Sequence, residues 1–297
     1  MYVVLFHRYD RLGCNLINYI AQIIYAHYHG YYIKFIDNKY NYSKYPNSRY
    51  YQILLNYINN VLNVKNDGRS PACPSDGTQN CYNLGSDEEI LYNLNKYDIQ
   101  LFCGFVTQAI KCDLLSYFHK HIYNDLDFKD LNDYYRVDYD FNNSVFCHLR
   151  LDDVSHKHDF DGAICSRYYK LLIENDKPCY NKFYDFVNNH SPLSKEKIMT
   201  MINDSKTNYP NDKLYMVTSP ISDTDFNEYE IISNVDVDKD LYILCNSKKS
   251  ILSRSMYALS SLFFSPKKEY CYLPSWGFFV TCGLNTKYDK NAFKYIY

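Results

Sequence analysis

Residues 145–154 form an apolar run that ends in four side chains able to do chemistry: His148, Arg150, Asp152 and Asp153. We expect the apolar part to be a strand, which puts His148 and Arg150 on one face because they are two residues apart. Ligands of open α/β sheets bind beyond the carboxyl ends of the strands, and the fork of an arginine matches a phosphate. The run therefore predicts a phosphate site, and its alternative is an ordinary Arg–Asp pair at the surface.

A second candidate lies near the N-terminus, where Gly13 and Asn15 follow an apolar run and precede a segment with helical spacing. Gly13 permits close approach of the backbone, Asn15 can cap the helix, and the start of a helix favours an anion. The segment lacks the GxGxxG pattern, so it does not predict a dinucleotide. A simple helix start is the alternative.

A third candidate is the segment 250–260, in which an apolar strand passes into a helix through Ser253 and Ser255. Hydroxyls and the first backbone N–H groups of a helix can bind phosphate oxygens. The alternative for this segment is an N-cap with no further role.

Metal and disulfide sites are not predicted. His156 and His158 are two residues apart, but no second pair of ligands has matching spacing. The 11 cysteines are odd in number and show no CxxC pair, which favours reduced thiols. Only Cys73 and Cys81 are placed to close a local loop.

The first half of the chain reads as the start of a parallel sheet. A strand at 2–6, a helix after residue 15 closed by Gly30, and a strand at 31–36 make a βαβ unit. Further elements are predicted from apolar periodicity: a helix at 50–62, an insertion at 65–88, a strand at 97–102 and a helix at 107–126. The polar run 127–143 predicts a domain boundary near residue 140.

The second half repeats this alternation, with strands, helices and turns in the following predicted order: strand 144–149, helix 166–174, helices around 181–204, strands 213–218 and 240–245, strand 250–252, helix 255–264 and strand 269–273. We therefore expect an α/β protein of two Rossmann-like domains, 1–140 and 141–297, that face a central cleft.

Charge and hydropathy restrict the partners. The formal net charge is −2, so the chain has no general basic field for nucleic acid. No stretch approaches 18 apolar residues, and the N-terminal run is too short for a signal peptide. The sequence predicts no nucleic-acid partner, no transmembrane segment and a cytoplasmic location.

The three candidate segments occur in the order seen in a known family. Residues 11–15 (Arg-Leu-Gly-Cys-Asn), 148–153 (His-Leu-Arg-Leu-Asp-Asp) and 251–255 (Ile-Leu-Ser-Arg-Ser), before a late Pro-Ser-Trp, resemble motifs of the GDP-fucose-dependent fucosyltransferase superfamily. This superfamily includes the α-1,2-, α-1,6- and protein O-fucosyltransferases. The resemblance spans nearly the full length, but each match is short. It implies the GT-B arrangement of two Rossmann-like domains and inverting transfer without a metal or cofactor.

The resemblance also implies roles for single residues. Arg150 would hold the β-phosphate of the GDP leaving group, His148 would contact the nucleotide, and Asp153 matches the acid that closes the motif. The remaining donor-binding residues implied are Gly13, Asn15, Ser253 and Ser255. The donor would be a GDP-sugar, and the acceptor a hydroxyl of a glycan or glycoprotein, with the N-terminal domain on the acceptor side.

Two departures from the family pattern leave the donor sugar open: Cys14 interrupts the common Gly-Asn pair, and Leu151 replaces a second basic residue. The general base is not assigned, with Asp153, Asp37 and His156 as candidates. A transferase for another nucleotide sugar is one alternative. The other, suggested by the 35 tyrosines, is a noncatalytic carbohydrate-binding or structural protein that keeps the fold.

Overall fold

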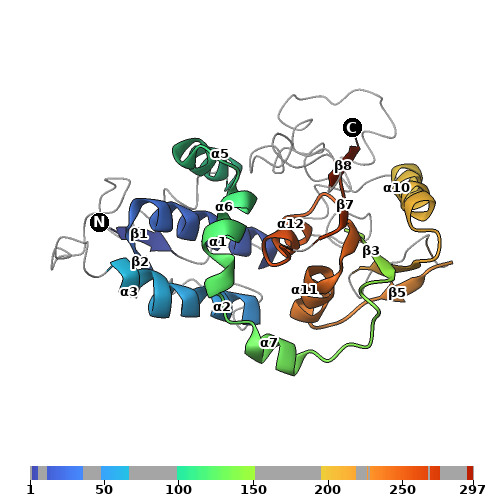
Figure 1. Ribbon diagram of the computed structural model, residues 1–297, viewed down its shortest axis with the longest axis horizontal. Coiled ribbons are helices and arrows are strands. Elements are labelled where there is room, and N and C mark those ends of the chain that lie inside the picture. The colour runs from blue at the N-terminus through green and yellow to red at the C-terminus, as the bar shows by residue number, and fades with distance from the viewer. Residues whose placement is uncertain are drawn as a thin grey trace, which may run out of the picture. The chain divides into compact units, whose positions relative to one another are not determined.

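The computed structural model describes residues 2–5, 12–35, 48–66, 99–150, 195–218, 226, 228–266, 268–274 and 293–296. The chain is a mixed α/β protein, as predicted, and it divides into two units between Arg136 and Val137 (Figure 1). The polar run 127–143 predicted this boundary near residue 140. Each unit is described by itself below.

The described part of unit 1 has two strands and several helices. Its described elements are β1 (Tyr2–Leu5), α1 (Leu12–His29), β2 (Tyr32–Phe35), α2 (Arg49–Tyr57), a π-helical turn (Ile58–Leu62), α3 (Asn63–Asn66), α5 (Ile99–Ile110), α6 (Leu114–His121), a 3-10 turn (Tyr123–Asp125) and α7 (Lys129–Tyr134). The two strands pair in parallel, so the predicted βαβ unit is confirmed. Whether unit 1 is a Rossmann-like domain stays a prediction, because its described sheet consists of β1 and β2 alone.

Helix α1 forms the centre of unit 1 because its apolar side chains recur at helical spacing. Leu16, Ile20 and Ile23 are fully buried, and the helix ends before Gly30, whose positive φ of 67° suits glycine. The side chain of Asn63 pairs with both backbone groups of Ile33, accepting from its N–H at 2.9 Å and donating to its C=O at 3.0 Å. At Ile33 this amide thereby makes the two hydrogen bonds that a neighbouring strand would make.

The predicted strand at 97–102 is wrong, since residues from 99 onward belong to helix α5. Short apolar runs do not distinguish strand from helix, and here Cys103, Val106 and Ile110 continue the pattern at helical spacing as buried residues. The predicted helix at 107–126 is not continuous: it comprises the end of α5, all of α6 and the 3-10 turn. Lys111 adopts a positive φ of 53°, and Asp113 caps α6 by accepting a 2.6 Å hydrogen bond from the N–H of Ser116.

Unit 2 contains a six-stranded sheet in which every described pair of strands is parallel. Its described elements are β3 (Ser144–His148), α10 (Lys195–Asn208), β4 (Lys213–Val217), β5 (Glu230–Ile232), α11 (Val237–Asn246), β6 (Lys249–Ile251), α12 (Met256–Phe263), β7 (Tyr270–Pro274) and β8 (Phe293–Ile296). The spatial order is β5-β4-β3-β6-β7-β8. Numbered along the chain, this is the 3-2-1-4-5-6 order of a doubly wound sheet.

Helices cover both faces of this sheet. On one face, Val145 and Cys147 of β3 pack in a core with Ile202 of α10. On the other face, Phe146 packs in a core with Ile243 of α11, and α12 lies beside α11 (Figure 1). All five residues of β3 are buried, as expected for a central strand covered on both faces.

The strand predicted at 240–245 is wrong, because these residues lie in helix α11. Asp236 caps this helix by accepting a 3.0 Å hydrogen bond from the N–H of Asp238, a start signal that the sequence analysis did not use. Strands β5 and β8 were not predicted. The predicted helix at 166–174 and most of the insertion at 65–88, with Cys73 and Cys81, lie outside the described residues.

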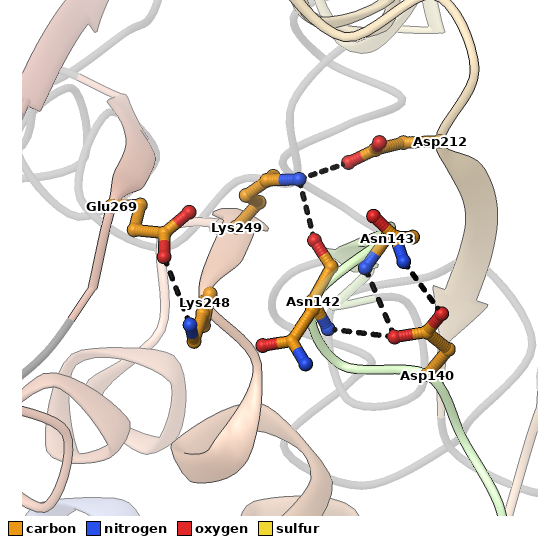
Figure 2. A network of polar contacts seen from close by, with 7 residues as sticks. All are labelled: Asp140, Asn142, Asn143, Asp212, Lys248, Lys249 and Glu269. Atoms are coloured by element: carbon orange, nitrogen blue, oxygen red, sulfur yellow. Dashed lines mark hydrogen bonds and ion pairs between the residues drawn. The ribbon is translucent and has the colours of Figure 1, made fainter.

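A buried ion pair ties the amino ends of three strands together. The ammonium of Lys249, at the start of β6, contacts the Asp212 carboxylate at 2.5 Å and donates to the Asn142 carbonyl at 2.6 Å (Figure 2). Asp212 precedes β4 and Asn142 precedes β3. Both charged side chains are at least nine-tenths buried, so they depend on each other for compensation.

Candidate functional site

The carboxyl ends of β3 and β6 form the topological switch point of the sheet. The chain proceeds from β3 to β4 and β5, and then returns to β6 on the opposite side of β3. Open α/β sheets bind ligands outside the strand ends at such a point. His148 is the last residue of β3, and Ser253 follows the end of β6 by two residues. The fold therefore places two predicted segments at one edge of the sheet.

Two hydrogen bonds join these segments directly. The Nδ1 atom of His148 and the Oγ atom of Ser253 are 2.6 Å apart, and both side chains are buried. The Nη1 atom of Arg150 donates to the carbonyl oxygen of Arg254 at 3.0 Å. The structure thus joins the end of β3 to residues 253 and 254, which are more than 100 residues away in the sequence, and it fixes the Arg150 guanidinium next to the start of α12.

Ser255 occupies the N-cap position of α12 with extended backbone, and its side chain does not make a capping hydrogen bond. Its backbone carbonyl accepts from the N–H of Leu259 at 2.9 Å, which starts the helix. The first N–H groups of a helix have no partner within it and favour negative charge. The predicted helix start is confirmed, and its N–H groups lie at the same sheet edge as Arg150.

Tyr257 borders this site on α12. Its ring centroid lies 5.6 Å from that of His148, and its hydroxyl donates to the Val237 carbonyl of α11 at 2.5 Å. Burial, followed by the charges of Asp240 and Asp238, raises the pKa of Tyr257 well above its usual value. The phenol therefore stays protonated and remains a hydrogen-bond donor.

Asp240 lies in the first turn of α11, next to the turn that joins β5 to this helix. Its carboxylate accepts from the Asn234 side-chain amide at 2.5 Å and from the Asn234 backbone N–H at 3.5 Å. Burial outweighs these hydrogen bonds and raises the pKa of Asp240 from 3.8 to about 7. At pH 6 the folded protein accordingly keeps this carboxyl protonated, whereas the unfolded chain ionises it.

This difference makes the stability of the fold depend on pH. Between about pH 4 and 7, Asp240 is protonated in the folded state and ionised in the unfolded chain. The contribution of this proton to the free energy of unfolding is therefore fully present below about pH 4 and is lost as the pH rises to 7. The decline amounts to roughly 4 kcal/mol at about 1.36 kcal/mol per pKa unit. The variant Asp240→Asn should lose this dependence and be the more stable protein at pH 8, measured by denaturant unfolding.

The exposed Asp138 provides the matched control for that experiment. Asp138→Asn should keep the wild-type dependence on pH. Equal slopes between pH 4 and 7 in wild type and Asp240→Asn would show that Asp240 does not ionise as described.

Gly13 and Asn15 belong to unit 1, and their predicted geometry is wrong. Helix α1 begins at Leu12, so Gly13 lies in the first helical turn instead of a preceding loop. Asn15 lies three residues after the helix start and cannot be its N-cap. Both residues are buried, and Asn15 is fully so. Their role in donor binding stays a prediction.

Asp153 and the other two candidate bases, Asp37 and His156, lie outside the described residues. Within the described ranges, no group of three or more His, Cys, Asp or Glu side chains could hold a metal ion. No described helix has both the length and the apolar character needed to cross a membrane.

Two neighbours of the site, Tyr257 and Asp240, were not among the residues predicted from the sequence. The signal for Tyr257 is its position two residues after Ser255, within the first turn of the predicted helix. Asp240 carries a weaker signal, because its burial follows only once residues 240–245 are recognised as helix.

Comparison with known proteins adds no relative: no family model, curated protein or solved structure matches this chain. The resemblance to the fucosyltransferases stays a prediction that rests on the short motifs.

Proposed function

We propose that the protein is an inverting glycosyltransferase that transfers a sugar from a GDP-sugar to a glycan or glycoprotein hydroxyl. Fucose is the donor sugar expected from the resemblance. The observation that supports the proposal is the joining of His148, Arg150 and Ser253 at the switch point of a doubly wound parallel sheet. An arginine fork beside the start of a helix suits a diphosphate.

In this reaction the acceptor oxygen bonds to the anomeric carbon of the donor. The bond from that carbon to the β-phosphate oxygen breaks, and its electron pair leaves with GDP. Arg150 and the first N–H groups of α12 stabilise the charge that develops on the diphosphate. The proton of the acceptor hydroxyl passes to a general base, for which Asp153, Asp37 and His156 are the candidates.

The proposal includes a second Rossmann-like domain for the first half of the chain, as in the GT-B arrangement, with the acceptor on that side. The parallel β1–α1–β2 unit supports it. A cytoplasmic location is also part of the proposal, and the buried free thiols of Cys147 and Cys271 support it.

GDP should stabilise the protein selectively. A ligand that binds only the folded state adds about 2.7 kcal/mol of stability at a concentration of 100 times its Kd. Thermal unfolding with GDP, UDP, CMP and ADP tests this, and we expect a rise in the midpoint with GDP alone. A rise with UDP instead would indicate another nucleotide sugar. The absence of a shift with all four would contradict nucleotide binding and favour the noncatalytic carbohydrate-binding alternative.

A further inference from the structure

Tyr257 connects three elements around the proposed donor site. The residue lies on α12, its hydroxyl bonds to the first residue of α11, and its ring faces His148 at the end of β3. His148 is thereby held from two sides, by the Ser253 hydroxyl at Nδ1 and by the Tyr257 ring. Few rotations of the imidazole keep both contacts.

The hydroxyl of Tyr257 keeps its ring in place. Val237 is the first residue of α11, and the bond from Tyr257 to its carbonyl spans the two helices that pack on this face of the sheet. The turn before α11 is fixed in addition by Asn234 and Asp240. The Tyr257 ring is therefore anchored to a packed part of the fold and not to the site alone.

We infer that Tyr257 is a positioning residue that orients His148 for binding of the donor nucleotide. This inference rests on the proposed function, because it takes the ligand to be GDP. Tyr257 acts through His148 and needs no contact with the nucleotide of its own. Its effect on GDP affinity should consequently disappear when His148 no longer has an imidazole.

A double-mutant cycle measures this dependence. The GDP dissociation constant is determined by calorimetry for the wild type, Tyr257→Leu, His148→Gln and the double variant. We expect Tyr257→Leu to weaken GDP binding about tenfold in the wild-type background and less than about twofold in the His148→Gln background. Tyr257→Phe keeps the ring and loses only the bond to Val237, so it should retain affinity within about threefold.

Tyr242→Leu is the matched control, because Tyr242 is a tyrosine of α11. Its effect on GDP affinity should be the same in both His148 backgrounds. If Tyr257→Leu does not fold, the same cycle is measured with Tyr257→Phe. We expect the smaller loss of GDP affinity caused by Tyr257→Phe to disappear in the His148→Gln background.

The outcomes separate this inference from the proposed function. GDP binding by the wild type combined with additive effects of the Tyr257 and His148 variants would overturn the positioning role alone. A failure of the wild type to bind GDP would overturn the proposed function and this inference with it.

Discussion

Replacing Arg150 with Ala is expected to slow sugar transfer from the GDP donor by about 10²- to 10³-fold, the loss typical when one preorganised donor to a developing oxyanion is removed. The guanidinium is preorganised because its Nη1 atom is bonded to the Arg254 carbonyl at 3.0 Å. The conformational entropy of the Arg150 side chain is thus already lost before the donor binds. The measurement is the rate of GDP release from the GDP-sugar in the presence of acceptor.

Two further arginine variants make this result specific. Arg150→Lys keeps the charge and loses the planar fork, so we expect a rate between those of the wild type and Arg150→Ala. Arg136→Ala removes an exposed arginine that precedes unit 2 and should leave the rate unchanged. Near-normal turnover by Arg150→Ala would contradict the role of this residue in stabilising the leaving group.

The largest effect on stability is expected at Lys249. Its replacement by Met leaves the Asp212 carboxylate buried without its cation, and removing one partner of a buried ion pair costs about 3–5 kcal/mol. The Asn142 carbonyl loses its 2.6 Å hydrogen bond in the same variant. Urea unfolding at neutral pH measures the change in the free energy of unfolding.

The neighbouring pair of Lys248 and Glu269 is a matched control, since its atoms are 3.0 Å apart but its side chains are 41% and 50% exposed (Figure 2). Lys248→Met should cost less than about 1 kcal/mol. The double variant Lys249→Met, Asp212→Leu should regain much of the stability lost by Lys249→Met, because it removes the uncompensated charge. Equal losses for Lys249→Met and Lys248→Met would contradict the importance of burial.

Elements were predicted correctly where the spacing of their apolar residues fits only a helix or only a strand. Helix α1 was recognisable because Leu16, Ile20 and Ile23 recur at helical spacing and Gly30 follows. Strand β3 was recognisable as an apolar run ending in charge. The errors at α5 and α11 have a common cause: a six-residue segment with four or five apolar residues fits a strand or a helix, and only its packing in the fold distinguishes the two.

The candidate site was predictable in part for a topological reason. The carboxyl ends of neighbouring parallel strands lie at the same edge of a sheet, and His148 at the end of β3 accordingly lies beside Ser253, which follows β6. Local sequence did not reveal that Tyr257 reaches Val237 of another helix, because that contact depends on how α11 and α12 pack. The first residue of helix α1 was also not predictable, because apolar spacing determines the boundaries of a helix less well than its centre.

The most direct test of the central claim, a phosphate site at the switch point, is a crystal structure of the protein with GDP. We expect the β-phosphate within hydrogen-bonding distance of the Arg150 guanidinium and of the first N–H groups of α12, next to Ser253. GDP bound elsewhere on the protein, with no phosphate contact at the ends of β3 and β6, would contradict the proposed site.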